Sequence, residues 1–456
     1  MSEPGAAAHP SDSGLFDGVL ARGPVREATG DRAWLQAMLD FEAALARALA
    51  RAGLASAEEA QAIGRACRAQ DYDVGELGRA ATSVGNPAEP LVRALIARLS
   101  GSAAGQVHRG ATSQDVLDTA MMLVARGALD LLLVDLHGAA GAAAALADRH
   151  RATPMAGRTL LQQALPISFG LQAAGWLAGL DDAAAALAAI RAHGLAAQLG
   201  GAAGTLASLG DAGPQVLGFL ADEVGLPAPE LPWHTARARV GALAGALGVA
   251  AGTIGKAARD VVLLAQSEVA EVREGGARRG GSSAMPHKRN PVAAVSALAC
   301  AARAPGLVAT LLGVWPEHQR GAGPWQAEWR PLGDLLVAVG SAAAWLRDCL
   351  THLIVDQARM RANLDRSGGL LLAERVAGAL APALGRLPAH DLVAEVAAEA
   401  ASSGLGFGEA LAARAEVRAR LSPEEIQRLL DPTGYLGSAQ LFVDRALAAY
   451  RARGPK

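Results

Sequence analysis

The sequence predicts an all-α protein with three helical domains and a central bundle of long helices. Apolar residues make up 51% of its 456 positions, but aromatic residues contribute only 4% and glycine contributes 53 residues. Such small side chains favour closely packed helices, and no segment shows the alternation that predicts strands. No proline occurs between Thr112 and Thr153, where small or apolar residues recur every three or four positions. We expect one helix of about thirty residues or more there, a length typical of helix bundles.

Residues 1–111 are expected to form the N-terminal helical domain. Trp34–Ala52 is amphipathic, and Ser56 is expected to cap the next helix, with Glu59 at the capping-box position. A further helix is expected near Leu91–Leu99, before the long helix that follows Thr112.

Residues 112–364 are expected to form the central domain. Besides the helix after Thr112, it should contain long helices at Ile167–His193, Thr235–Glu274, Val292–Leu312 and Leu332–Met360. The uncharged stretch Thr159–Leu180 could cross a bilayer by length, but its glutamines and Pro166 favour a buried bundle helix. Residues 365–456 are expected to form a small C-terminal helical domain. Its helices should be short, with breaks between them at Pro382, Pro388, Gly404 and Pro423.

Charge and cysteine content exclude several classes of protein. The net charge of −2 at pH 7 gives no reason to expect a nucleic-acid or membrane partner. Cys67, Cys300 and Cys349 are scattered without metal-ligand spacing, which favours a reduced, cytoplasmic protein over a zinc protein. The N-terminus lacks the basic and apolar regions of a signal peptide. No cofactor or metal motif is found, and we expect none.

The segment Gly281–Pro291, GSSAMPHKRNP, combines hydroxyls and cations directly after a glycine-rich stretch. Asn290 is predicted to cap a helix whose first position is Pro291. The glycines upstream make the backbone permissive, so we expect loop closure to bring a serine of this segment, beside Lys288 and Arg289, to an anionic substrate. For any part of this string taken alone, a basic surface loop is the alternative interpretation.

Two other segments place polar side chains where a ligand could bind. In HRGATSQD, residues 108–115, Thr112 and Ser113 stand at a helix start, where hydroxyls and free N–H groups suit a carboxylate. An ordinary helix cap has the same sequence pattern, so that alternative stays open. In GRTLLQQALP, residues 157–166, Thr159 and Gln162 flank two leucines.

These three segments resemble the signatures of the fumarase/aspartase superfamily, GSSxMPxKxNP for the first and GxTHxQxAxP for the last. The superfamily histidine is Leu160 here, which we expect to line an apolar pocket. Amines and hydroxide leave poorly unless a general acid protonates them. A carboxylate leaves unaided, because its conjugate acid has a pKa of about 4. The missing acid therefore favours opening or closing of a lactone.

Together with HRGATSQDVLDTA and the segment Glu317–Trp329, this loss makes the chain similar to the 3-carboxymuconate cycloisomerase branch of the superfamily. The similarity runs from about Trp34 into the C-terminal domain, where Gly378–Val396 also fits. It implies three all-α domains, a homotetramer with a twenty-helix core, active sites shared by three subunits, and a small tricarboxylate substrate. Packing alone would also explain the tryptophans of Glu317–Trp329.

The resemblance also implies roles for individual residues. Ser282 would protonate carbon in the lactonising direction and remove that proton in reverse, with Ser283 the less favoured candidate. The oxyanion of Ser282 would need stabilisation by backbone N–H groups and Lys288. The residues expected to bind substrate are His108, Thr112, Ser113, Thr159, Gln162, Lys288 and Asn290. A structural role for His108 stays open, as does substrate contact by Arg278, Arg279 and Arg320.

Two other functions stay open at this stage. A C–N lyase of the adenylosuccinate or argininosuccinate type would release fumarate, and His108 or His287 could replace the missing acid. A purely structural protein, like the lens proteins recruited from this superfamily, is the second. The serine, lysine and asparagine of the basic loop argue against it, because a structural bundle has no use for them.

Overall fold

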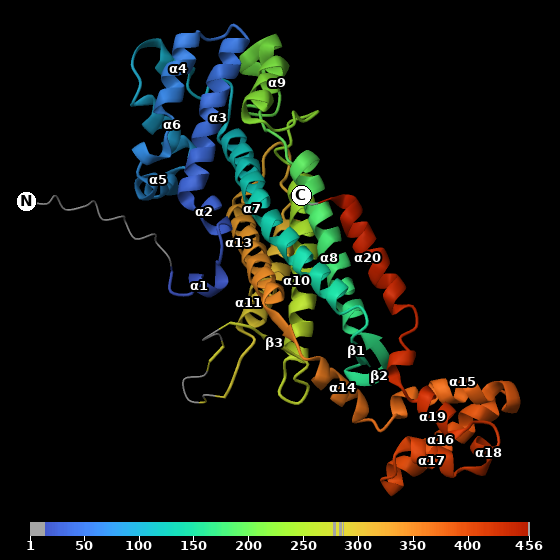
Figure 1. Ribbon diagram of the computed structural model, residues 1–456. Coiled ribbons are helices and arrows are strands. Elements are labelled where there is room, and N and C mark those ends of the chain that lie inside the picture. Colours follow the sequence, from blue (N-terminus) through green and yellow to red (C-terminus); the bar gives the residue numbers. More distant parts are fainter. Residues whose placement is uncertain (1–13, 277–279, 282–284, 286, 455–456) are drawn as a thin grey trace, which may run out of the picture. The chain divides into compact units, whose positions relative to one another are not determined.

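The computed structural model describes residues 14–276, 280–281, 285 and 287–454. It confirms the predicted helical fold, since only short strands interrupt the helices of the described chain (Figure 1). The chain forms two compact units. Unit 1 comprises Met1–Leu136, Asp182–Gly255 and Ser296–Leu346, and unit 2 comprises His137–Asp181, Lys256–Val295 and Arg347–Lys456. The three domain ranges expected from the sequence stay a prediction.

Unit 1 begins with short helices that pack around α3 (Asp31–Arg51), which confirms the helix predicted at Trp34–Ala52. The predicted capping box opens α4 (Ala57–Ala66). There the Glu59 amide donates to Ser56 Oγ at 3.2 Å, and the Ser56 amide donates to the Glu59 carboxylate at 2.8 Å. The other elements of this region are α1 (Asp17–Leu20), α2 (Val25–Ala28), η1 (Ala69–Asp71), α5 (Val74–Ala80), η2 (Ala81–Ser83), α6 (Ala88–Ile96) and η3 (Gly101–Gln106).

Long helices follow. The first, α7 (Ser113–Arg149), has 37 residues and confirms the length predicted for it. The others are α8 (Phe169–Ala189), extended by the π-helical turn η4 (Ile190–Gly194), α10 (Ala238–Leu264) and α13 (Pro324–Thr351); η5 (Ala207–Ala212) and α9 (Gly213–Val224) connect η4 to α10. By length and composition alone, Phe169–Gly194, Ala238–Leu264 and Val292–Leu312 could cross a membrane, and no more than 50% of each apolar window is buried inside the chain.

Three predicted long helices are shorter or interrupted. Pro305 lies in the first turn of α12 (Ala304–Leu312), so Val292–Leu312 is divided into α11 (Val292–Ala301) and α12. Beyond α10 and α13, the β-branched residues around Val272 and Val355 form strands instead of helix. These strands, β3 (Val272–Glu274) and β4 (Leu353–Val355), pair antiparallel, and α14 (Gln357–Asp365) follows.

The predicted helix over Thr159–Leu180 is wrong for its first ten residues, as is the expectation of no strands. Here β1 (Pro154–Thr159) pairs antiparallel with β2 (Gln162–Ser168), and α8 begins directly afterwards. The turn residues Leu160 and Leu161 have φ of 51° and 64°. Two-residue turns of this kind usually contain Asn or Gly. Because these leucines carry no such signal, the hairpin was not recognisable from the sequence.

Unit 2 ends in short helices with a hydrophobic core of their own, formed around residues such as Val376, Val396 and Phe407. As predicted, α16 (Arg386–Ser403) ends at Gly404, with φ of 75°, and Pro423 begins α19 (Pro423–Leu429). Pro382 and Pro388 lie inside helices instead of between them. The remaining elements are η6 (Leu370–Leu372), α15 (Ala373–Leu384), α17 (Phe407–Ala413), α18 (Ala415–Arg418), η7 (Pro432–Gly434) and α20 (Ala439–Arg453).

Candidate active site

The start of α7 lies where the sequence predicted it. Thr112 and Ser113 are half-buried there. The Thr112 amide donates to Asp115 Oδ2 at 2.9 Å, and the Asp115 amide donates to the Thr112 carbonyl at 2.9 Å. Asp115 therefore holds the residue before the helix, Thr112, against its first turn. The hydroxyls of Thr112 and Ser113 are the side-chain groups at this helix start that suit a ligand.

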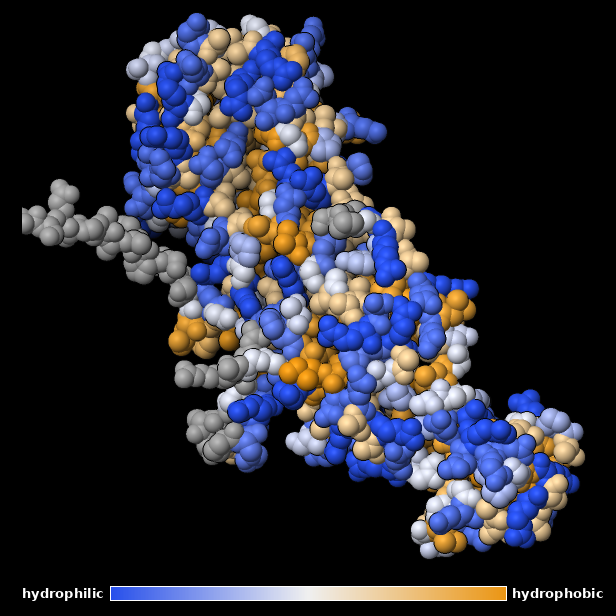
Figure 2. Space-filling model, in the orientation of Figure 1, coloured by the Kyte–Doolittle hydropathy of each residue, from blue (hydrophilic) through white to orange (hydrophobic). Residues whose placement is uncertain are grey.

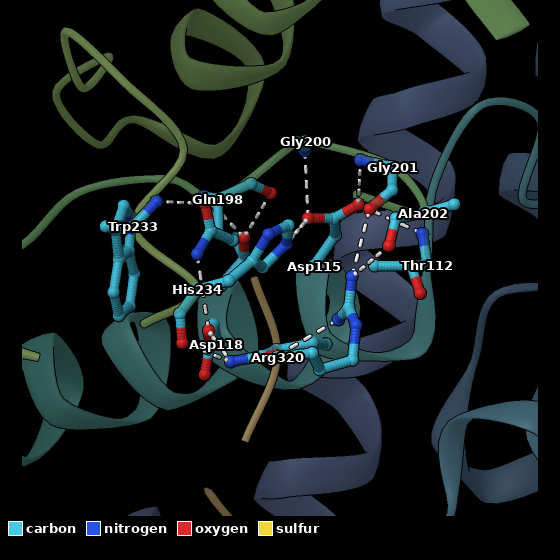
Figure 3. A network of polar contacts seen from close by, with 12 residues as sticks. Thr112, Asp115, Asp118, Gln198, Gly200, Gly201, Ala202, Trp233, His234 and Arg320 are labelled. Carbon is cyan, nitrogen blue, oxygen red and sulfur yellow. Dashed lines mark hydrogen bonds and ion pairs between the residues drawn. The ribbon is translucent and has the colours of Figure 1, made fainter. Parts of the chain in front are cut away.

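Asp115 is also the centre of a buried polar network (Figure 3). Its fully buried carboxylate accepts from His234 Nε2 at 2.6 Å and from the Gly200 amide at 2.9 Å through Oδ1, and from the Gly201 amide at 3.0 Å through Oδ2. A buried carboxylate is stable when its lone pairs are matched by donors in this way. The network fixes the loop at Gly200 and Gly201 against the first turn of α7.

A second buried carboxylate, Asp118, lies one turn further along α7. Arg237 donates to it from Nη1 at 2.8 Å and Nη2 at 3.0 Å, and Trp325 Nε1 donates at 3.1 Å. Arg237 Nε also donates to Glu328 at 2.9 Å. Burial alone would lower the pKa of Arg237, but the charges and hydrogen bonds of both carboxylates raise it overall. This charged cluster ties α7, the start of α10 and α13 together, so Trp325 has a structural role.

Arg320 is a cation close to the start of α7 (Figure 3). Its Nη1 donates to Gln114 Oε1 at 3.0 Å, and its Nη2 donates to the carbonyls of Gly201 and Ala202 at 3.1 and 2.8 Å. All of these partners are neutral oxygens, so these bonds hold the guanidinium in place without cancelling its charge. The charge can attract an anion to this region.

His108 precedes α7 and is held by Glu42 of α3. The Glu42 carboxylate accepts from the His108 amide at 3.0 Å and pairs with His108 Nδ1 at 2.7 Å. Burial lowers the pKa of His108, but the hydrogen bond and charge of Glu42, with the charge of Asp115, raise it overall. The protonated ring is therefore more stable than in a free histidine, and 20% of the side chain stays exposed.

Thr159 and Gln162 lie in unit 2, paired across the end of the β1–β2 hairpin. Between them, Leu160 is 97% exposed and Leu161 is 71% exposed. The expectation that Leu160 lines an apolar pocket is therefore wrong for the single chain, because a two-residue turn projects it into solvent. The turn itself contains no titratable side chain.

The predicted catalytic residue, Ser282, lies outside the described residues, as do Ser283, Arg278 and Arg279. Next to them, the Asn290 amide donates to the Gly280 carbonyl at 2.8 Å. Gly280 has φ of 65°, and a Cβ there would lie 2.0 Å from the Asn290 carbonyl oxygen, so the position requires glycine. Asn290 is half-buried and Lys288 is exposed.

The helix after this loop, α11, begins at Val292, one residue later than predicted. Its first amides, those of Ala293 and Ala294, donate to the Glu274 carboxylate at 3.0 and 2.8 Å. The helix start is therefore capped by a carboxylate from β3, where the sequence suggested Asn290. Glu274 lies 19 residues before Ala293, too far away for a capping motif to reveal it.

Each compact unit holds part of the predicted site. Unit 1 brings His108, Thr112 and Ser113 together, and unit 2 holds Thr159, Gln162, Lys288 and Asn290. Sequence reasoning missed the supporting residues Asp115, Asp118, His234, Arg237 and Glu328. The one available signal was the pair Asp115 and Asp118, which stand three residues apart within an apolar helix.

Two family profiles match the chain: the family described as Lyase over residues 20–306, and Adenylosuccinate lyase C-terminus over residues 369–446. The chain is 49% identical to 3-carboxy-cis,cis-muconate cycloisomerase of Bradyrhizobium diazoefficiens, over 95% of this chain and 98% of that protein. It is 45% identical to nitrosuccinate lyase of Streptomyces davaonensis, over 96% of this chain and 94% of that protein.

A solved structure gives the same result. The 3-carboxy-cis,cis-muconate lactonizing enzyme from Pseudomonas putida matches with a TM-score of 0.91 and 43% sequence identity, over 96% of this chain and 99% of that one. The chain therefore belongs to the lyase family of the fumarase/aspartase superfamily, and it is similar over nearly its whole length to cycloisomerases of 3-carboxy-cis,cis-muconate.

Proposed function

We propose that this protein is a 3-carboxy-cis,cis-muconate cycloisomerase, which interconverts that tricarboxylate and 4-carboxymuconolactone in protocatechuate breakdown. The observation that carries the proposal is the similarity to cycloisomerases over nearly the whole chain. The hairpin turn agrees with it, because it offers only Leu160 and Leu161 where the superfamily signature GxTHxQxAxP has a histidine. A lactone carboxylate leaves without an acid, whereas an amine does not.

The reaction needs one proton donor and several groups that bind anions. A substrate carboxylate oxygen adds to a double-bond carbon, and the displaced electron pair is held on the next carbon as an aci-carboxylate. Ser282 gives its hydroxyl proton to that carbon and regains a proton from solvent, so the trianionic substrate becomes a dianionic lactone. Lys288 and backbone N–H groups stabilise the serine oxyanion. In reverse, the oxyanion removes the proton and the carboxylate leaves.

Binding of the substrate falls to the remaining candidates. His108, whose pKa is raised, and the hydroxyls of Thr112 and Ser113 supply donors at the start of α7. Arg320 adds positive charge there, which favours a tricarboxylate over less charged molecules. Thr159, Gln162 and Asn290 bind further carboxylate oxygens. These substrate-binding roles are assigned from the family resemblance and from the chemistry of each side chain.

We infer that the enzyme is a homotetramer whose active sites are each completed by three subunits. Three helices support this, because each carries an apolar side chain that the single chain leaves in solvent, and apolar surface is visible on one face of the chain (Figure 2). Val134 on α7, Val249 on α10 and Val295 on α11 are 60%, 61% and 49% exposed. Helix faces of this kind are covered when copies of a chain pack together. We place the tetramer in the cytoplasm, consistent with three free cysteines.

Nitrosuccinate lyase is the second candidate, because a relative of that name is 45% identical to the chain. Nitrite, like a carboxylate, is a stable anion that leaves without protonation by an acid. Leu160 therefore does not separate these two activities, and only the substrate can. It does disfavour a C–N lyase that expels an amine.

An ultraviolet assay of the purified enzyme tests the proposal. Closing the lactone removes the conjugated diene of 3-carboxy-cis,cis-muconate, so absorbance should fall. Nitrosuccinate, adenylosuccinate and argininosuccinate serve as parallel substrates, with fumarate as the measured product. Turnover of nitrosuccinate alone would establish the second candidate, and turnover of either amine-releasing substrate would establish a C–N lyase.

A further inference from the structure

Glu42 is a buried carboxylate that the proposed reaction does not use directly. It lies on the buried face of α3 and is 1% exposed, between helix neighbours that are themselves buried and apolar. A carboxylate in such surroundings is costly unless it is hydrogen-bonded and paired with a cation. Both hydrogen bonds found for it in the described chain go to His108, one to the amide and one to Nδ1.

The backbone around His108 holds the ring in one place. His108 has φ of 60°, a left-handed backbone conformation that residues other than glycine seldom adopt. The Ala111 amide donates to the His108 carbonyl at 3.2 Å. Gly110 packs so closely that a Cβ would lie 2.5 Å from Leu209. This fixed turn leads directly into α7, so the position of the imidazole is set relative to Thr112.

Because Nδ1 bonds an anionic carboxylate, it carries a proton, and the second nitrogen, Nε2, lies across the ring from Glu42. We infer that Glu42 is a positioning residue, which holds His108 so that Nε2 donates a hydrogen bond to a substrate carboxylate at the start of α7. This inference rests on the proposed function. It assigns Glu42 a role through His108, without contact between Glu42 and the substrate.

Charges near His108 come from three directions. Glu42 of α3 and Asp115 of α7 favour the protonated ring, while the neighbouring Arg109 donates to the Leu54 carbonyl and to Gln106. With Glu42 present, the pKa of His108 is raised, so the cation persists as the pH rises past the ordinary value of about 6.5. Glu42→Gln keeps an acceptor but removes the charge, so the ring loses its proton at a lower pH.

Calorimetric binding of tricarballylate, a saturated tricarboxylate that cannot lactonise, tests the role of Glu42. Measured from about pH 5.5 to about pH 8, the affinity of Glu42→Gln should fall below that of wild type as the pH rises, by up to about tenfold, because His108 loses its proton at a lower pH in the variant. At about pH 5.5 the difference should narrow markedly, because His108 is protonated without help. Glu425→Gln, which changes the exposed capping carboxylate of α19, is the matched control. Equal weakening at both pH values, or none at about pH 8, would overturn the inference.

Two further variants separate positioning from general damage. Glu42→Asp keeps the charge and should recover much of the affinity at about pH 8, and failure to do so contradicts the inference. In His108→Asn, adding Glu42→Gln should weaken binding no further, since the two residues act as one unit. An additional loss of about tenfold would show that Glu42 acts by another route. These readouts do not use turnover, so an inactive wild type would overturn the proposed function alone.

Discussion

Two helix starts in this protein are predicted to face an anionic substrate, and they are built differently. At the start of α7, Asp115 of the same helix accepts from the Thr112 amide, and its buried carboxylate also binds His234 and the loop at Gly200. The first turn of α11 is closed by Glu274, a half-buried carboxylate from β3. One start is supported by a buried network, and the other by a single side chain.

The comparison suggests that side chains, and not backbone amides alone, bind the substrate at these helix starts. At α11 a protein carboxylate already occupies amides of the first turn, and at α7 a carboxylate occupies the amide of Thr112 just before it. Side chains are therefore expected to hold the substrate, namely His108, Thr112 and Ser113 at α7 and Lys288 and Asn290 at α11. We therefore expect substitutions near α7 to affect both stability and activity, and those in the loop to affect activity alone.

The largest effect is expected in the loop. Ser282→Ala should lower turnover by about 10²–10⁴-fold, the usual contribution of a general acid or base, and Ser283→Ala should lower it less. The Tm and the oligomeric state should stay close to wild type, since the substitution removes a single hydroxyl group. Steady-state kinetics and thermal unfolding measure the two quantities. Turnover above about a tenth of wild type in Ser282→Ala would remove this serine from the mechanism.

The second prediction tests whether the two helix starts of one active site come from different subunits. Ser282→Ala and Thr112→Val should each be nearly inactive alone. After subunit exchange, about a quarter of the sites in mixed tetramers should combine an intact Thr112 with an intact Ser282, because random mixing fills the two positions independently. Activity should then rise well above either variant. Mixed tetramers verified by mass spectrometry that stay inactive would count against shared sites.

The third prediction concerns stability. Asp115→Ala leaves His234 and the amides of Thr112, Gly200 and Gly201 without their buried acceptor, so it should cost about 3–5 kcal/mol of unfolding free energy. Glu274→Ala removes one helix cap at a half-buried position and should cost about 1 kcal/mol. Urea unfolding of both variants measures the difference. Similar costs would mean that the two helix starts are supported equally.

Sequence patterns located these two helix starts within a residue, because capping and proline signals are local. They also predicted the length of α7 and the helical class, and the structure confirms both. The supporting network was not predictable, because Asp115 lies 119 residues from His234 and 85 from Gly200. The Leu160-Leu161 turn was missed for a different reason, since its backbone is set by strand pairing and not by turn residues.

The smallest effect is expected for Leu160→His, which introduces the histidine of the superfamily signature GxTHxQxAxP. Leu160 is 97% exposed and has φ of 51°, a conformation that histidine adopts more readily than leucine. The single chain therefore gives no reason to expect the loss of stability that a buried position would bring, and the unfolding free energy should change by less than about 0.5 kcal/mol.

Leu160→His should also gain no cycloisomerase activity, because an attacking carboxylate must be deprotonated and leaves unaided in reverse. Both proteins are assayed on 3-carboxy-cis,cis-muconate and on adenylosuccinate and argininosuccinate, from which wild type should release no fumarate. A loss of several kcal/mol in the assembled enzyme would show that another subunit covers the hairpin turn. Fumarate release by wild type would show that an acid acts from elsewhere, most directly His108, and would replace the lactone argument with a C–N lyase.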